Sequence, residues 1–295
     1  MMPNGIIVPV ITPFDQKQNI DENALRSVIR HILNGGVHGI FVTGTTSEFY
    51  ALSHEDHERI FQIAVEEVRG RVPVYAGTTG ITTKEAICLT KIAEDCGVDA
   101  VSVLTPYFIS LTQEELYQHY KAIAESTSLP VILYDNKPKT NLTIRPETVE
   151  RLSKIDNIVG MKDSTGDLTN TLEIIRRTRE NTDFHVLMGR DSLIFSALCS
   201  GAAGAVAACA NVAPRLVSDI YDKFMAGDLA GAREAQFTLL PLRIAFSLGS
   251  FPAVIKEAME MIGIDVGVCK LPTSCLNSKE RNELHLILTG MGLIS

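Results

Sequence analysis

Lys162 is a lysine whose surroundings in the sequence could make its amine a nucleophile. It follows the apolar run 158–161 and precedes Asp163 and Ser164, a pattern that predicts a buried strand at the point where it leaves its sheet. Burial disfavours the charged ammonium, and a neutral lysine amine attacks carbonyl carbon to form a Schiff base. The alternative is a lysine with a buried stem whose charged head reaches water. The run itself leaves both interpretations open.

Polar or flexible residues also end three other apolar runs, namely Gly44-Thr45-Thr46, Tyr134-Asp135-Asn136 and Gly189-Arg190-Asp191. Gly44 lets the backbone approach a ligand closely, and loop amides with the hydroxyls of Thr45 and Thr46 can bind a carboxylate. Tyr134 supplies a phenol that can relay protons beside the lysine. Each group has a structural explanation of its own, such as a turn or a surface ion pair. Together with Lys162 they predict a site for a 2-oxo acid.

The segments that must position these residues alternate between two patterns of apolar residues. Short β-rich apolar runs, typical of strands covered on both faces, are separated by segments with the 3.6-residue period of amphipathic helices. The eight runs cover residues 5–14, 38–44, 72–78, 100–106, 130–136, 158–164, 183–190 and 204–211. Eight strand–helix units predict an α/β fold, the TIM (β/α)8 barrel, with its active site at the carboxyl ends of the strands. A doubly wound open sheet is the alternative, but no Gly-x-Gly-x-x-Gly fingerprint follows the first run.

Helix signals complete this organisation. Ser53 and Thr112 are predicted to cap helices, Thr112 within a capping box, and Asp21 and Asp191 are further candidate caps. From Asp228 onward the strands stop, and segments 229–246, 252–262 and 278–288 are predicted to form three more helices. We therefore expect a barrel catalytic domain over 1–227 and a C-terminal helical extension over 228–295.

Composition limits the classes of partner. The chain has 295 residues, of which 45% are hydrophobic. Its formal net charge of −8 predicts that neither nucleic acid nor an anionic membrane is a partner, because both would be repelled. No run approaches the ~20 apolar residues of a membrane span, and the first residues show no signal-peptide pattern. The six cysteines lack metal-type spacing and are interpreted as reduced core residues, although Cys269 and Cys275 could pair. We expect a cytoplasmic protein.

The chain resembles the dihydrodipicolinate synthase / N-acetylneuraminate lyase family over nearly its whole length. The motifs that carry the resemblance are Gly44-Thr45-Thr46-Ser47-Glu48, Thr105-Pro106-Tyr107, Leu133-Tyr134-Asp135-Asn136 and Gly160-Met161-Lys162-Asp163-Ser164. The resemblance implies a TIM barrel with C-terminal helices, assembled as a homotetramer that is a dimer of dimers. It also implies a Schiff base with pyruvate or another 2-oxo acid, and no metal or organic cofactor.

The resemblance also implies roles for individual residues. Lys162 matches the Schiff-base lysine, Tyr134 the tyrosine that shuttles protons, and Thr45 the hydroxyl of the proton relay. Thr46 matches the residue that binds the carboxylate of the 2-oxo acid, and Val206 falls where the family has a backbone carbonyl near the lysine. The predicted substrate-binding set is Thr46, Gly44, Lys139, Gly189 and Val206, and no metal ligand is predicted.

Three positions depart from the family pattern. Ser47 replaces a glycine of the loop, and Phe108 replaces a tyrosine that the synthases contribute across a dimer interface to the proton relay. Lys139 stands where the synthases hold the carboxylate of the second substrate with an arginine. A lysine attracts a carboxylate but cannot form the planar bidentate fork of arginine.

These observations predict a carbon–carbon lyase of the class I aldolase type. The departures favour reversible cleavage of a hydroxylated 2-oxo (sugar) acid. The alternatives are 4-hydroxy-tetrahydrodipicolinate synthase proper, or a non-catalytic barrel that binds 2-oxo acids. A metal-dependent aldolase would need several His, Asp or Glu ligands at strand ends, whereas His54 and His57 lie on a predicted helix.

Overall fold

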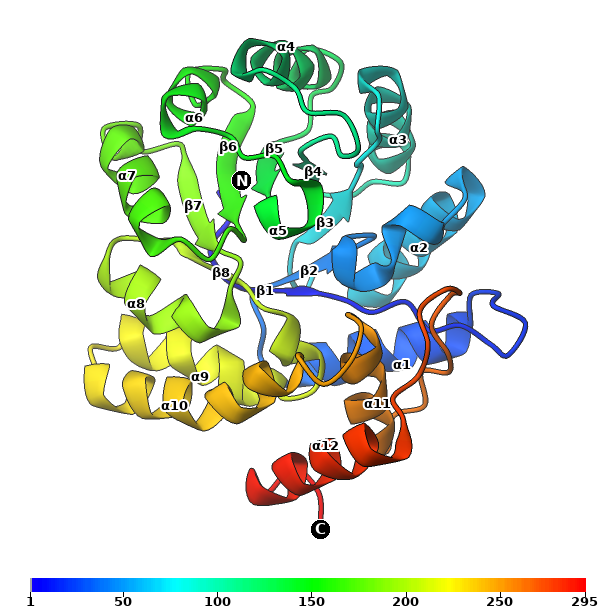
Figure 1. Ribbon diagram of the computed structural model, residues 1–295. Helices are drawn as coiled ribbons and strands as arrows, with labels where there is room; N and C mark the ends of the chain where they lie inside the picture. Colours follow the sequence, from blue (N-terminus) through cyan, green and yellow to red (C-terminus); the bar gives the residue numbers. More distant parts are fainter. Residues whose placement is uncertain (1) are drawn as a thin grey trace.

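A closed barrel of eight parallel strands forms the centre of the computed structural model, which describes residues 2–295 (Figure 1). Each strand pairs with the next one along the chain, and β8 pairs with β1. The strands are β1 (Gly5–Pro9), β2 (Gly39–Val42), β3 (Val74–Gly77), β4 (Ala100–Leu104), β5 (Val131–Asp135), β6 (Ile158–Asp163), β7 (His185–Met188) and β8 (Gly204–Val206). The predicted TIM barrel is confirmed, with every strand inside its predicted run.

Helices surround the barrel and cover the outer faces of its strands (Figure 1). Those of the barrel are α1 (Glu22–Asn34), α2 (His54–Val68), α3 (Thr83–Asp95), α4 (Gln113–Ala124), α5 (Lys137–Thr140), α6 (Pro146–Leu152), α7 (Leu168–Thr178), α8 (Ile194–Cys199) and α9 (Pro214–Met225). Three more follow: α10 (Leu229–Ala245), α11 (Ala253–Met261) and α12 (Ser278–Gly290). The C-terminal extension of three helices is therefore confirmed as well.

The predicted helix starts are confirmed at three of four positions. Asp21 accepts a hydrogen bond from the backbone of Ala24, and Ser53 and Thr112 each close a capping box. The prediction for Asp191 is wrong, because its carboxylate accepts the backbone N–H of Cys209 at 2.7 Å instead of capping a helix. Asp191 begins a short 3-10 turn, and this turn directs its side chain toward the chain that follows β8.

Two predicted runs continue about five residues past the ends of their strands, further than the other six. Residues 10–14 and 207–211 leave the sheet after β1 and β8, and Ala208–Asn211 form a 3-10 turn. The amide of the buried Asn211 accepts the N–H of Ile11 at 3.1 Å and donates to the carbonyl of Pro9 at 2.9 Å. A side chain therefore satisfies backbone groups that a longer strand would have paired, and the apolar pattern carries no sign of it.

The barrel interior is packed below the level of Lys162. One inward-facing residue from each strand contributes to an apolar cluster: Ile7, Phe41, Tyr75, Ala100, Ile132, Val159, Leu187 and Val206. A second and larger cluster fills the space between the strands and the outer helices. Because the interior is filled in this way, the carboxyl ends of the strands remain as the place for a cavity.

The extension is joined to the barrel by a buried ion pair. Nζ of Lys256 in α11 lies 2.8 Å from Oε1 of Glu48, and both side chains are almost fully buried. Lys256 also donates to the carbonyl of Val268 at 2.6 Å, and Glu48 accepts the N–H of Lys270 at 2.8 Å. Helix α10 packs along α9 (Figure 1). The division into domains at residue 227 stays a prediction.

The cysteines differ in part from expectation. All six are free thiols, and only Cys209 and Cys269 are buried. The core positions predicted for Cys88, Cys199 and Cys275 are wrong, because α3, the end of α8 and the loop before α12 present these residues to solvent. Among residues 2–295, no helix combines the length and the apolarity that crossing a membrane requires.

Candidate active site

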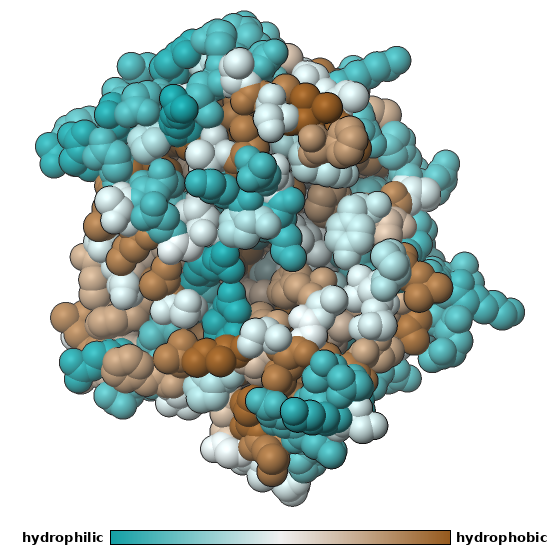
Figure 2. Space-filling model, viewed as in Figure 1, coloured by the Kyte–Doolittle hydropathy of each residue, from teal (hydrophilic) through white to brown (hydrophobic). Residues whose placement is uncertain are grey.

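A cavity of about 200 Å³ opens at the carboxyl ends of the strands. The space-filling view shows it as a hollow in the middle of this face (Figure 2). Seven of the eight predicted site residues line it: Thr45, Thr46, Tyr134, Lys139, Lys162, Gly189 and Val206. Residues from five strand ends, far apart in the sequence, therefore meet at one cavity.

Lys162 and Tyr134 lie side by side because their strands pair in register. Tyr134 of β5 is the pairing partner of Lys162 of β6, and both side chains face the barrel axis. Lys162 is only 5% exposed, and its Nζ lies 3.8 Å from the centre of the Tyr134 ring and 5.0 Å from that of Phe41. The amine thus lies among aromatic rings at the base of the cavity, with little access to water.

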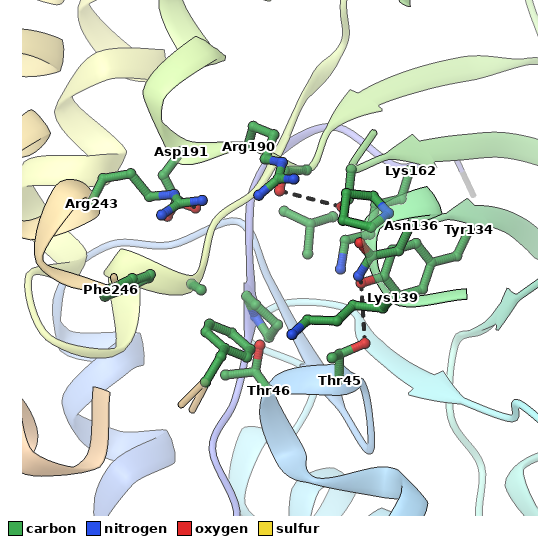
Figure 3. Close-up of a pocket in the computed structure, with 17 residues that line it drawn as sticks. Thr45, Thr46, Tyr134, Asn136, Lys139, Lys162, Arg190, Asp191, Arg243 and Phe246 are labelled. Carbon is green, nitrogen blue, oxygen red and sulfur yellow. Dashed lines mark hydrogen bonds and ion pairs between the residues drawn. The ribbon is translucent and has the colours of Figure 1, made fainter. Parts of the chain in front are cut away.

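The hydroxyl of Tyr134 belongs to a short hydrogen-bond chain (Figure 3). It lies 3.2 Å from Oγ1 of Thr45 and accepts a hydrogen bond from Nδ2 of Asn136 at 3.0 Å. Burial raises the pKa of Tyr134, but the charge of Lys162 and the hydrogen bonds of Thr45 and Asn136 together bring the pKa below its usual value. A phenol of this kind can release and recover a proton next to the lysine.

The loop after β2 carries Thr45 and Thr46 in a 3-10 turn. Gly44 precedes this turn and does not line the cavity; a Cβ added to it would lie 2.9 Å from the Phe41 ring. Gly44 therefore shapes the loop that carries Thr45 and Thr46, and its predicted role in substrate binding stays a prediction. Ser47, one of the departures from the family pattern, donates to the carbonyl of Val10 at 2.5 Å and anchors the loop to the chain after β1.

Gly189 and Val206 form the wall at β7 and β8. The N–H of Gly189 donates to the carbonyl of Asp163 at 2.7 Å, and a Cβ at residue 189 would collide with the Ser164 hydroxyl. Glycine is required here by the close approach of two strand ends. Lys139, on the short helix α5, is exposed and lies at the rim of the cavity.

Several residues at the cavity were not selected from the sequence. Asn136 is one of them, although its place two residues after Tyr134 on the same strand end was a usable signal. Arg190 follows Gly189 and was noted only as a polar strand end. Arg243, Phe246 and Phe251 come from α10 and the segment after it, and no local pattern marks them. Phe108, in contrast, does not line the cavity; it is 89% exposed with φ of 80°.

Asn136→Val is expected to slow imine formation with pyruvate about fivefold, because the Tyr134 hydroxyl loses one neutral hydrogen bond of ~1 kcal/mol. The pKa of Tyr134 should rise, since that bond helps to lower it. The pH at which the trapping rate is half-maximal should therefore move upward. The rate of borohydride trapping, measured against pH, checks both expectations. A slower reaction with an unmoved pH profile would contradict this role.

Comparison with known proteins agrees with this geometry. The model of the dihydrodipicolinate synthetase family matches residues 2–291 of the chain. The chain belongs to this family. It is accordingly an enzyme, a carbon–carbon lyase of the class I aldolase type.

Relatives within the dihydrodipicolinate synthetase family cover the full chain. The 4-hydroxy-tetrahydrodipicolinate synthase of Syntrophus aciditrophicus (strain SB) is 40% identical over 99% of this chain and 100% of its own. The dihydrodipicolinate synthase of Thermotoga maritima has a solved structure with a TM-score of 0.96 at 30% identity, covering 100% of both chains. A prophage protein of E. coli K12 from this family, solved in complex with pyruvate, has a TM-score of 0.96 at 31% identity, covering 99% of this chain and 100% of its own.

Proposed function

We propose that the protein is a 4-hydroxy-tetrahydrodipicolinate synthase, which condenses pyruvate with L-aspartate 4-semialdehyde. The observation that carries the proposal is full-length similarity to relatives of that name, at 37–40% identity in the first five. It favours the synthase over the cleavage of a hydroxylated 2-oxo acid expected first from the sequence. The placement of Lys162, Tyr134, Thr45 and Thr46 around one cavity supports it.

In the proposed mechanism the Lys162 amine attacks the keto carbon of pyruvate. The hydroxyl of the resulting carbinolamine leaves as water with a proton from Tyr134, which gives a cationic imine. Tyr134, now a phenolate, takes a proton from the methyl carbon, and the electron pair moves to the imine nitrogen, so that a neutral enamine forms. Thr45, 3.2 Å from the phenol oxygen, passes protons between Tyr134 and the cavity. Thr46 and the amides of its turn hold the pyruvate carboxylate.

The carbon–carbon bond forms in the second half of the reaction. The nucleophilic carbon of the enamine attacks the aldehyde carbon of the semialdehyde, and the new alkoxide takes a proton from Tyr134. The amino group of the adduct then attacks the imine carbon and displaces the Lys162 amine, which closes the ring and frees the enzyme. Gly189 and Val206 bound the space in which the adduct folds back on itself.

A second candidate function is reversible cleavage of a hydroxylated 2-oxo acid. It is favoured by Phe108, which brings no hydroxyl to a proton relay, and by Lys139 in place of an arginine. We expect kcat/KM for condensation of pyruvate with aspartate semialdehyde to exceed that for cleavage of 2-keto-3-deoxy sugar acids by at least about tenfold, or ~1.4 kcal/mol in transition-state stabilisation. Both rates are measured on one preparation, with Lys162→Ala as the blank. The reverse ranking would replace the synthase by the lyase.

We further propose a homotetramer in the cytoplasm, as the family resemblance implies. The exposure of the large apolar side chains of Phe108, Tyr50, Ile81 and Ile109 supports the presence of an interface that covers them. Light scattering coupled to gel filtration tests the assembly: a mass of four chains supports it, and a mass of one chain excludes it.

A further inference from the structure

Arg190 brings a positive charge to the cavity wall that no protein group neutralises. Within residues 2–295 its guanidinium takes part in no ion pair or hydrogen bond, and its Nε is buried without an acceptor. Burial lowers the pKa of Arg190, and the nearby charge of Arg243 adds to this effect. A half-buried cation without a partner is costly, which indicates a group that joins it from outside the chain.

The carboxylates nearest to Arg190 are engaged elsewhere. Asp191 accepts the N–H of Cys209 at 2.7 Å, and its second oxygen lies 3.8 Å from Nε of Arg243. Asp163 accepts the hydroxyls of Thr165 at 2.6 Å and Thr171 at 2.7 Å. Neither acid pairs with Arg190, so the cavity keeps an excess of positive charge.

The guanidinium lies close to a glycine. Gly166 has φ of 82°, and a Cβ added there would lie 3.3 Å from Nε of Arg190. The side chain of Arg190 thus lies against bare backbone. The close-up shows it on the side of the cavity opposite the loop of Thr45 and Thr46 (Figure 3). An anion bound to Arg190 would therefore be a different one from a carboxylate held by Thr46.

We propose that Arg190 binds the carboxylate of the second substrate and is the residue that selects an acidic aldehyde. The proposal rests on the proposed function, in which Thr46 takes the carboxylate of pyruvate and the aldehyde enters from the opposite side. Arginine suits this role because its planar donors match a carboxylate in a bidentate fork. Lys139 is exposed at the rim of the same cavity, where its ammonium is a second positive charge without the planar donor geometry of arginine.

Trapping of a product-like acid tests the proposal without requiring turnover. 2-Oxoheptanedioate has the seven-carbon diacid chain of the condensation adduct, and 2-oxoheptanoate lacks only the distal carboxylate. Borohydride trapping, titrated with each acid, gives their apparent affinities. Arg190→Met should weaken binding of the diacid about ten- to hundredfold, the usual effect of losing a charged hydrogen-bond partner, and leave the monoacid and pyruvate unchanged. Arg190→Lys should fall in between.

Lys139→Met is the matched control, since it removes a second cation of the same cavity. If Lys139→Met shows the selective loss and Arg190→Met does not, the carboxylate binds at Lys139 and the proposal is overturned. If Arg190→Met weakens binding of the diacid and of the monoacid equally, Arg190 maintains the shape of the cavity wall and does not bind the distal carboxylate. The two proposals can also fail separately. If the wild type prefers the diacid and Arg190→Met removes that preference, but the wild type does not condense aspartate semialdehyde, the synthase function is refuted while Arg190 remains the carboxylate-binding residue.

Phosphate is the other anion that a guanidinium binds well, and a second assay separates the two. Condensation of pyruvate with aspartate semialdehyde and with glyceraldehyde 3-phosphate is compared in the wild type and in Arg190→Met. We expect the variant to lose condensation of the carboxylated aldehyde about ten- to hundredfold. Loss confined to the phosphorylated aldehyde would overturn the assignment to a carboxylate.

Discussion

Lys162→Ala is expected to abolish borohydride trapping of pyruvate and to leave the protein folded. Among residues 2–295, the alanine removes the only lysine amine that lies at the base of the cavity, 3.8 Å from the centre of the Tyr134 ring. The side chain lines a cavity instead of filling the core, so its loss should change the melting temperature little. Intact-mass spectrometry after reduction measures the adduct, and circular dichroism measures the fold.

The matched control for this experiment is Lys139→Ala, which removes the other lysine of the same cavity. It should still be trapped by borohydride, because Lys139 lies at the exposed rim and not beside the phenol. An adduct that persists in Lys162→Ala and maps to Lys139 or Lys256 would show that the nucleophile has been misassigned.

Tyr134→Phe is expected to lower kcat by ~10²–10⁴, the range for one positioned acid–base group. The substitution keeps the ring beside Lys162 and removes only the hydroxyl that contacts Thr45 and Asn136. Single-turnover measurements of imine formation should show the loss directly. Thr45→Val leaves the phenol in place and should cost less. If Tyr134→Phe retains full single-turnover rates, another group must carry the protons.

The sequence was sufficient for the fold and for the centre of the site because both depend on local pattern. Continuous apolar runs predict the strands, and barrel closure then places the carboxyl end of each strand at one face. Lys162 and Tyr134 meet because β5 and β6 are consecutive and pair in register. Strand order makes the two strands neighbours, and their register, which shifts between Val131 and Ile132, aligns these two residues.

What the sequence could not show depends on long-range packing. Arg243 and Phe246 reach the cavity from α10 because that helix packs against α9 and the turn at Asp191, a contact that no spacing encodes. Gly44 is predicted to bind the ligand from its residue type, and the structure adds a neighbour that the sequence did not indicate, the Phe41 ring packed against it. A glycine in a loop indicates backbone freedom and does not say which neighbour requires it.

The prediction of the substrate from the sequence is limited in a similar way. Phe108 and Lys139 are single departures in a chain that otherwise follows its relatives over its full length. Read alone they favour a lyase for sugar acids. In the structure Arg190 provides a second cation at the cavity that the local motif does not contain. One altered position is weak evidence when another element can supply the same charge.

The buried pair of Glu48 and Lys256 has a consequence for how the molecule opens. Glu48 directly follows the turn of Thr45 and Thr46, so separating it from Lys256 of α11 would leave each of two buried charges without its partner. The substrate loop and the C-terminal helices should therefore unfold locally as one cooperative unit, with similar amide exchange rates. Variation in α11, on the outside of the barrel, can in this way change the local stability of the substrate loop without altering any residue that contacts the substrate.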